Sequence, residues 1–427
     1  MTGGPAPTRI LLRSPRDLLS RSRPITIYRD NMINNNSGNL IFTHAVQRTL
    51  SVSNAHVHSD LARIDPQQAD RINNEYDLYV LPFANAFRPS FHQALERYCE
   101  LIERLTIPVV IVGIGAQFPL PELDADTSRL TRLLPTVHRF MRAVLARSAS
   151  VGVRGEVTYR FLRSIGYSES DVTVIGCPSL FQFGPTLHVS KEADLTPDSP
   201  LCINISPYLW EMGPIALNHA QRYPNIRYIA QDRATLRTLL YWQNPDTAEI
   251  MSPQIPYRIT DPLIRDGRTW FFVDPTTWID HLRQRSFSFG SRIHGNITSL
   301  LAGTPAVLLG HDSRTVELAE YHGIPYRLLT ELAPDTDASE LFGWADYTEF
   351  NTGQQERFDR YLRFLEANNL DHVFTGTVSA TAGVEEFDRK VAAARNPGPV
   401  TRPTKGQLRR RHAAAQVRSI PRRLRLK

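Results

Sequence analysis

The sequence predicts an α/β protein with two parallel-sheet halves. Short apolar stretches typical of strands alternate with amphipathic helical stretches along most of the chain. Several strand candidates are apolar throughout, which is typical of parallel strands buried on both faces. The alternation pauses in a proline-containing stretch at 185–200 and then resumes, which predicts two domains joined near residue 195.

The first half supplies an N-terminal α/β domain, predicted at 24–195 behind an extended arm at 1–23. Ile25–Tyr28 begins this domain as a strand, Asn34–Asn39 forms a turn, and a helix covers 40–50. The later elements are, in order, a strand at 76–82, a helix at 91–105, a strand at 108–117, a helical region at 127–147 interrupted at Pro135, a strand at 150–154, a helix closed by Gly166 and a strand at 171–179.

The second half supplies a C-terminal α/β domain, predicted at 196–330. Its predicted strands lie at 201–206, 227–232, 269–274, 286–290 and 305–310. A helical segment is expected at 331–395, with an amphipathic helix at 352–370. From 396 to 427 Pro, Arg and Ala dominate without core periodicity, which predicts a basic tail that is disordered or forms a short basic helix near its end.

The charge of the chain is concentrated in this tail. The 427 residues include 49 Lys and Arg against 43 Asp and Glu, a formal net charge of +6. The tail holds ten of the basic residues and no acidic one, so the remainder has 39 basic against 43 acidic residues, a net charge of −4. The folded part is therefore slightly acidic, and nucleic-acid binding by the whole protein is disfavoured.

The cysteine content and the lack of long apolar runs bear on the cellular compartment of the protein. It has three scattered cysteines, no apolar run of about 18 residues and no apolar core of a secretory signal at its N-terminus. We expect a cytoplasmic protein without disulfides or a metal site. The tail has three interpretations that stay open: it is solvated, it lies on anionic lipid at the inner membrane surface, or it contacts nucleic acid.

The stretch SFGSRIHGNITSLLAG places two cationic side chains where a strand turns into a helix. In doubly wound sheets, ligands bind beyond the carboxyl ends of the strands, and a helix N-terminus favours anions. Arg292 offers a planar fork for phosphate or carboxylate, and His294 can donate a hydrogen bond or exchange a proton. Gly295 allows close approach to the backbone. The residues predict an anion site with an acid–base group beside it.

This region also resembles the polysaccharide pyruvyl transferase family. The resemblance rests on the stretch GSRIHGNITSLLAGTPAVLLGHDSRTVELAEYHGIP, which contains an R-x-H-G turn, a G-x-P motif and a G-I-P motif. Three earlier stretches resemble the family in the same order: NNNSGNLIF, PVVIVGIGAQ, and SVGVRGEVTYRFLRSIG followed by VIGCPS. The resemblance covers roughly residues 25–330.

The resemblance implies a GT-B-like arrangement, in which two Rossmann-like domains face a cleft. It implies a transferase that moves the pyruvyl group of phosphoenolpyruvate onto two sugar hydroxyls, as a ketal, and releases phosphate. The acceptor would be a glycan or a lipid-linked saccharide of exopolysaccharide synthesis. Arg292 and His294 would hold phosphoenolpyruvate, with Arg154 helping from the N-terminal domain, where the acceptor would bind.

Other candidate residues follow from the same comparison. Asp312 and Glu317 are weaker catalytic candidates than His294, each as a base, and each is equally well explained as a turn acid or a solvated helix acid. Asn36, Gly38 and Asn39 form either an acceptor loop or a plain turn, since Asn side chains suit sugar hydroxyls. The family's turn usually reads Gly-Asp, and Asn39 in place of the acid leaves the acceptor open.

Two other functions remain open on the sequence. One is a GT-B nucleotide-sugar glycosyltransferase, for which Glu317 offers a late acidic residue. The other is a non-catalytic glycan- or lipid-associated protein that keeps the fold. Gly113-Ile114-Gly115 lacks the full G-x-G-x-x-G pattern, so we expect no cofactor, with phosphoenolpyruvate as a substrate.

Overall fold

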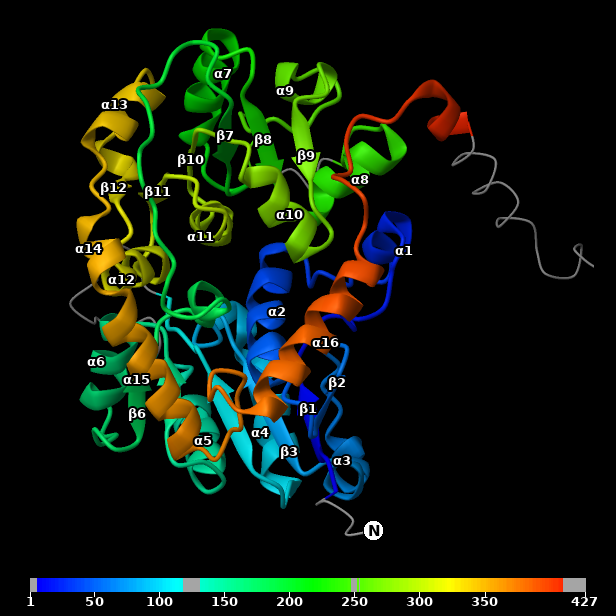
Figure 1. Cartoon of the computed structure of the whole chain (residues 1–427), viewed down its shortest axis with the longest axis vertical. Coiled ribbons are helices and arrows are strands. Elements are labelled where there is room, and N and C mark those ends of the chain that lie inside the picture. Colours follow the sequence, from blue (N-terminus) through cyan, green and yellow to red (C-terminus); the bar gives the residue numbers. More distant parts are fainter. Residues whose placement is uncertain (1–5, 118–130, 247–251, 253, 410–427) are drawn as a thin grey trace, which may run out of the picture.

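The computed structural model describes residues 6–117, 131–246, 252 and 254–409, and it confirms the α/β class with two parallel-sheet domains (Figure 1). In the N-terminal sheet the strand order is β2-β1-β3-β4, and a parallel bridge between Ile114 and Val153 joins it to β5 and β6. The strands are β1 (Thr8–Leu12), β2 (Ala55–Ser59), β3 (Leu78–Pro82), β4 (Val109–Val112), β5 (Val151–Val153) and β6 (Val172–Val174).

The C-terminal sheet has the order β12-β11-β10-β7-β8-β9, with parallel pairing throughout. Counted from β7, this is the Rossmann order, and the strand order reverses between β7 and β10. The strands are β7 (Leu201–Asn204), β8 (Arg227–Ala230), β9 (Thr269–Phe271), β10 (Phe287–Gly290), β11 (Ala306–Gly310) and β12 (Tyr326–Leu328).

Helices connect the strands in both domains. In the N-terminal domain they are α1 (Pro24–Arg29), α2 (Gly38–Leu50), α3 (Ala69–Glu75), α4 (His92–Arg104), α5 (Leu134–Leu145) and α6 (Glu156–Ser164). In the C-terminal domain they are α7 (Met212–Arg222), α8 (Arg233–Tyr241), α9 (Pro262–Arg265), α10 (Pro275–Leu282), α11 (Ile293–Leu301) and α12 (Ser313–His322).

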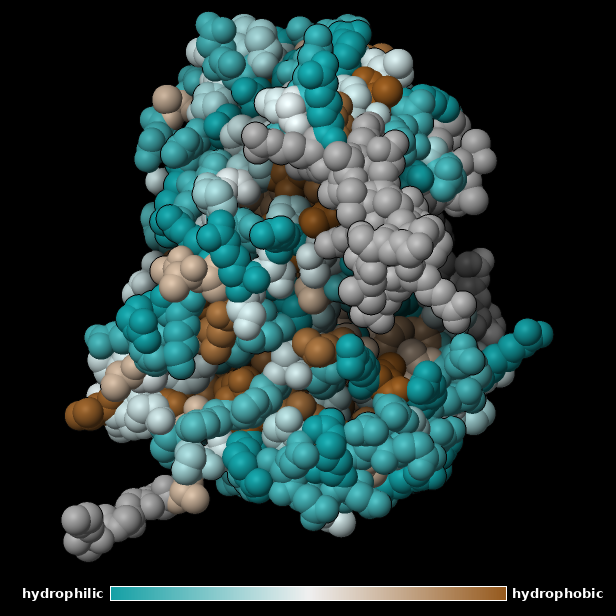
Figure 2. Space-filling model, turned by 90° about the vertical axis from the view of Figure 1, so that its right-hand side faces the viewer, coloured by the Kyte–Doolittle hydropathy of each residue, from teal (hydrophilic) through white to brown (hydrophobic). Residues whose placement is uncertain are grey.

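Helix α2 lies between the two sheets and packs against α10 and α11 of the other domain (Figure 1). It is buried along most of its length, and one apolar core runs from Ile10 of β1 through Ile41 of α2 to Phe289 of β10. The face in Figure 2 is largely hydrophilic, with hydrophobic residues gathered in the hollowed middle of the molecule. The two domains are therefore joined by a shared core.

The start of the chain corrects the sequence prediction. The expected arm at 1–23 contains β1, which pairs with both β2 and β3 inside the sheet. The predicted strand Ile25–Tyr28 is helix α1, because Pro24 in the first helical turn fixes a helical φ and outweighs the strand preference of Ile and Thr. The other predicted strands of both domains are present.

The end of the chain crosses back to the N-terminal domain. The segment predicted as helical holds α13 (Ala338–Trp344), α14 (Thr348–Thr352), α15 (Gln354–Ala367) and α16 (Val378–Ala394). After α15, Asn368 Oδ1 accepts a hydrogen bond of 3.0 Å from the backbone N–H of Ala149, and Asp388 of α16 pairs with Arg48 of α2 at 2.7 Å. Figure 1 shows α15 and α16 running along the N-terminal half.

The prediction of a disordered tail from residue 396 is wrong for its first part. Val400 pairs with Phe271 of β9 in an antiparallel bridge, and the Asn396 N–H donates to Asp274 Oδ2 at 3.0 Å. Backbone hydrogen bonds to an exposed sheet edge order this stretch without any apolar periodicity. The rest of the tail, from residue 410, lies outside the described residues.

Candidate functional site

The turn from β10 to α11 carries Arg292 and His294 at the reversal of strand order. β10 ends at Gly290, where φ is +145° and a Cβ atom would lie 1.9 Å from the carbonyl oxygen of Asn204, so only glycine fits. Asn204 ends β7, and its side chain accepts from the Arg292 N–H at 2.8 Å and donates to Asn296 at 3.0 Å. The motif thus occupies the ligand-binding position of a doubly wound sheet.

A narrow cavity of about 60 Å³ beside this turn is enclosed by side chains from both domains. Three arginines line it, namely Arg292, Arg314 and, from the turn between β5 and α6, Arg154, together with His294. Arg154 is 2% exposed and donates from Nε to the Gly113 carbonyl at 2.9 Å. Its Nη2 is buried without a hydrogen-bond partner among the described residues. A buried cation with an open donor favours an anionic ligand.

His294 is neutral in the ligand-free protein. Burial, followed by the charges of Arg154, Arg314 and Arg292, lowers the pKa of His294 to about 3. Helix α2 packs closely against this residue, since a Cβ atom on Gly38 would lie 2.8 Å from the Cβ of His294. An anion bound among the arginines would raise the pKa of His294 again, because it favours the charged imidazolium.

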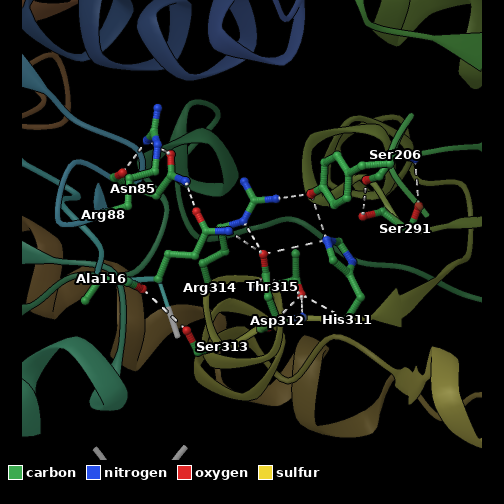
Figure 3. A network of polar contacts seen from close by, with 12 residues as sticks. Asn85, Arg88, Ala116, Ser206, Ser291, His311, Asp312, Ser313, Arg314 and Thr315 are labelled. Carbon is green, nitrogen blue, oxygen red and sulfur yellow. Dashed lines mark hydrogen bonds and ion pairs between the residues drawn. The ribbon is translucent and has the colours of Figure 1, made fainter. Parts of the chain in front are cut away.

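Asp312 is held in a network that crosses between the domains (Figure 3). It caps α12 through Oδ1, while Oδ2 accepts from Arg314 Nε at 2.6 Å and from Gln117 Nε2 at 3.3 Å. Burial would raise the pKa of Asp312, but Arg314 and His311 hold it below its ordinary value. On the other side Asn85 donates to Gln117 at 2.9 Å. Asp312 therefore orients Arg314 at the edge of the cavity.

Glu317 lies behind the site, across the domain interface. It is 1% exposed and accepts hydrogen bonds of 3.0 Å from the backbone N–H and from Oγ1 of Thr158. Burial raises the pKa of Glu317 to about 7, although the hydrogen bonds from Thr158 and the charge of Arg154 act to lower it. Its side chain lines neither the narrow cavity nor the wider chamber described next.

A wider chamber of about 490 Å³ adjoins the narrow cavity. The two share several lining residues, among them Asn36, Asn39, Arg292 and Arg314. The amide of Asn39 also secures its own loop, because Nδ2 donates to the Ile33 carbonyl at 3.0 Å. The residues Asn36, Asn39, Arg154, Arg292 and His294, which were predicted from separate stretches, thus come together at one place.

Two predicted glycines serve packing at this place. Gly38 N–H donates to Asn36 Oδ1 at 2.9 Å in the loop that leads into α2. Gly295 lies in the first turn of α11, where a Cβ atom would lie 2.7 Å from the side chain of Asn204. Both bring helices close to the site rather than offering a side chain to it.

Sequence reasoning missed part of the chamber wall. Arg13, Asn85, Arg88 and Gln117 line the chamber and follow the ends of β1, β3 and β4. The rule that ligands bind at the carboxyl ends of parallel strands could have indicated them, once β1 was recognised as a strand. Tyr208, which follows β7, also lines the chamber, and its hydroxyl accepts from Arg314 Nη2 at 2.6 Å.

The comparisons with known proteins give one family and distant structural similarity. No curated protein matches the chain. Among solved structures it is similar to a putative UDP-N-acetylglucosamine 2-epimerase from Listeria monocytogenes, with 10% identity and a TM-score of 0.43 over 85% of this chain and 96% of that one. It is also similar to the Methanocaldococcus jannaschii UDP-GlcNAc 2-epimerase solved with UDP-GlcNAc and UDP, with 11% identity and a TM-score of 0.41 over 84% of this chain and 99% of that one. At these values the similarities carry no argument about substrate.

The helices of the described part of the chain include none long and apolar enough to cross a membrane. The family model for polysaccharide pyruvyl transferase matches residues 36–313, well over half of the chain. That range includes the Asn36 loop, Arg154 and the turn with Arg292 and His294. The chain therefore belongs to the polysaccharide pyruvyl transferase family and is an enzyme of that type.

Proposed function

We propose that this enzyme transfers the pyruvyl group of phosphoenolpyruvate onto two hydroxyls of a glycan, forming a ketal and releasing phosphate. The observation that carries the proposal is the narrow cavity, in which Arg154 and Arg292 from opposite domains have no carboxylate partner within the described chain. Phosphoenolpyruvate carries a phosphate and a carboxylate, and arginine forks suit both groups.

The two spaces fit the two reactants. The narrow cavity suits a small anionic group, so the phosphate would lie among Arg154, Arg292 and the N-terminus of α11. The remainder of the donor would face the wider chamber, where amide side chains such as Asn36, Asn39 and Asn85 suit sugar hydroxyls. Donor and acceptor would then meet where the two spaces share their walls.

The reaction needs two carbon–oxygen bonds to form and one to break. One acceptor hydroxyl oxygen bonds to the enol carbon of phosphoenolpyruvate, and the methylene carbon takes up a proton. The second hydroxyl oxygen bonds to the same carbon, and the bond between that carbon and the phosphate oxygen breaks. Of the two protons lost by the hydroxyls, one balances the new methyl group and the other leaves with phosphate.

His294 is the residue we assign to proton exchange. Its low pKa of about 3 leaves it neutral before the donor binds, and the bound anion raises that pKa so that the imidazole can take and return a proton. Asp312 is a weaker base, because its oxygens already accept from Arg314, Gln117 and the start of α12. Glu317 is occupied by Thr158 behind the site.

The alternative of a nucleotide-sugar glycosyltransferase is less well supported, because its candidate acid, Glu317, lies outside both spaces. A glycosyltransferase would need a free acid to bind ribose, and Glu317 lines neither space. We therefore favour phosphoenolpyruvate as the donor. The acceptor would be a precursor of an exopolysaccharide, used in the cytoplasm, and lipid contact through the basic tail stays a prediction.

The test is phosphate release from phosphoenolpyruvate with glycan acceptors present. We expect the wild-type protein to release phosphate and to gain thermal stability with phosphoenolpyruvate but not with a nucleotide sugar. His294→Ala should fold normally and lose release by about 100-fold or more, as expected for an acid–base group. His188→Ala, at an exposed histidine, is the matched control. Nucleotide release instead of phosphate release, or full turnover by His294→Ala, would contradict the proposal.

A further inference from the structure

The wider chamber holds two cations that the donor does not require. Arg13 follows β1 and Arg88 follows β3, so both lie on the N-terminal wall, while Arg292 and Arg314 lie on the C-terminal wall. Neither Arg13 nor Arg88 lines the narrow cavity. Their charges thus belong to the acceptor side of the site.

Arg88 is half-buried and lacks an acidic partner in the described chain. Its Nε donates to Ser90 at 2.9 Å, and its Nη1 donates to the backbone carbonyl and Oδ1 of Asn85, the latter at 2.7 Å. Nη2 has no hydrogen-bond partner among the described residues, and no Asp or Glu there lies within 4.0 Å. Burial, then repulsion from Arg314 and Arg13, lowers the pKa of Arg88 to about 10.

Arg13 is held by neutral groups as well. Its Nε donates to the Tyr98 hydroxyl at 2.8 Å and its Nη1 to the Pro82 carbonyl at 3.1 Å, and the guanidinium lies 4.9 Å from the centroid of the Phe83 ring. The nearby carboxylate of Asp60 accepts hydrogen bonds from other groups, including Tyr79 at 2.6 Å. Arg13 and Asp60 form no ion pair within 4.0 Å among the described residues.

The charges of the donor can be matched without these two residues. Phosphoenolpyruvate brings at most three negative charges. Arg154 and Arg292 meet it directly, and Arg314 adds a third guanidinium that Asp312 partly neutralises. Burial opposes the charge of Arg13, but Tyr98 and Asp60 raise the pKa of Arg13 above its ordinary value, so this charge is partly compensated. Arg88 has no such carboxylate among the described residues, and an anion between Arg88 and Arg13 would relieve the repulsion between the two guanidinium groups.

We propose that the acceptor carries an anionic group, a phosphate or a carboxylate, that binds to Arg88 and Arg13 in the wider chamber. The proposal rests on the function proposed above, because it names the class of its second substrate. The planar forks of the two arginines suit either oxyanion. The anion would fix the acceptor at one end and leave its hydroxyl pair facing the donor.

Inorganic phosphate is the first probe, because it reports both anion sites without any assumption about the sugar. Calorimetric titration of the full chain at low salt should give two phosphates bound per wild-type chain and one per chain of Arg88→Gln. Arg88→Lys keeps the charge and should retain the second site with weaker affinity. Arg97→Gln, at an exposed arginine of α4, makes the same charge change away from the chamber and should keep both sites.

Phosphoenolpyruvate then separates this inference from the proposed function. It should displace one phosphate from the wild-type protein and leave the second in place. If it displaces neither, the proposed donor is wrong while the second site stands. If it displaces both, if wild type binds a single phosphate, or if the second site survives Arg88→Gln, the inference is overturned.

Sugars identify the source of the anionic group. With phosphoenolpyruvate present, galactose 1-phosphate, methyl galacturonoside and methyl galactoside would be tested for displacement of the second phosphate. Displacement by the glycosyl phosphate indicates a phosphate-bearing acceptor, and displacement by the uronoside indicates an acidic sugar. Each should lose about tenfold or more in affinity in Arg88→Gln. Displacement by the neutral galactoside alone, or by none of the three, overturns the inference.

Discussion

The narrow cavity and the wider chamber differ in how their cations are supported. In the narrow cavity Arg154 is buried, its Nη2 has no partner within the described chain, and the neighbouring His294 is held neutral. In the chamber the half-buried Arg88 is braced by Asn85 and Ser90, and asparagines make up much of the wall. Each space thus holds a guanidinium with an open donor among the described residues, but that of Arg154 is fully buried, whereas that of Arg88 is half-buried and more accessible.

The largest expected effect on this contrast comes from removing the charge of Arg154. Arg154→Met should lower phosphate release from phosphoenolpyruvate by about 100- to 1000-fold, because it deletes a charge-assisted donor in a site shielded from water. The ligand-free protein should be about as stable as wild type, since the change removes a buried charge that forms no ion pair among the described residues but that also attracts the carboxylate of Glu317. Thermal melts with and without phosphoenolpyruvate, together with the release assay, measure both effects.

The matched control for this change is Arg160→Met, at an exposed arginine on α6, which follows the same turn. It should leave activity, stability and stabilisation by phosphoenolpyruvate unchanged. If Arg154→Met instead unfolds the free protein while Arg160→Met does not, Arg154 acts mainly in support of the fold, and the contrast between the two spaces is lost.

A second, smaller change tests the packing of α2 against His294 beside the narrow cavity. In Gly38→Ala the new methyl group would lie 2.8 Å from the Cβ of His294, which cannot swing away, so α2 and α11 must move apart. We expect about a tenfold loss in affinity for phosphoenolpyruvate and about 1–3 kcal/mol of lost stability. Gly343→Ala, which adds a methyl group in open space on α13, is the control. Equal effects of the two substitutions would show that the close approach of α2 does not matter.

The smallest expected effect is a proton linkage. The pKa of His294 is lowered to about 3 in the free protein. As the pH falls from about 6.5 towards 3, the unfolded state therefore takes up a proton at this residue and the native state does not. The free energy of unfolding decreases over that pH range. A bound anion raises this pKa, so phosphoenolpyruvate binding at pH 6 should take up a fraction of a proton.

Calorimetry of phosphoenolpyruvate binding in buffers of different ionisation enthalpy measures that uptake. The donor's own phosphate also titrates near pH 6, so the result is the difference between wild type and His294→Asn. No difference between the two would mean that His294 stays neutral in the complex. The larger role assigned to it in proton exchange would then have to pass to another group.

The sequence predicted the C-terminal wall of the site better than the N-terminal wall. Arg292 and His294 stand in one short motif at a strand end, so local pattern and the rule for doubly wound sheets were enough. Arg154 came only from the family resemblance. Arg13 and Arg88 follow strands β1 and β3, and β1 was mistaken for an arm because its apolar run, Ile10–Leu12, is short and borders basic residues.

Tertiary contacts explain what else was missed. β2, with the sequence AHVHS, is an edge strand whose alternating half-exposed residues give little apolar signal. The bond of Asp312 to Gln117, and that of Glu317 to Thr158, join residues far apart in sequence. No local pattern indicates that these acids are already occupied, so their assignment as bases could be weighed only against the folded chain.

The shared wall of the two spaces has a consequence for the order of events in turnover. The donor phosphate would lie in the narrow cavity, with the acceptor in the chamber next to it. A glycan seated against Asn36, Asn39 and Arg292 would cover the donor, so phosphoenolpyruvate should bind first and phosphate should leave last. Phosphate bound in the narrow cavity would then compete with phosphoenolpyruvate for the free enzyme, whereas phosphate bound at Arg88 would compete with the anionic group of the acceptor. The cellular ratio of phosphate to phosphoenolpyruvate would therefore control how fast the glycan is modified.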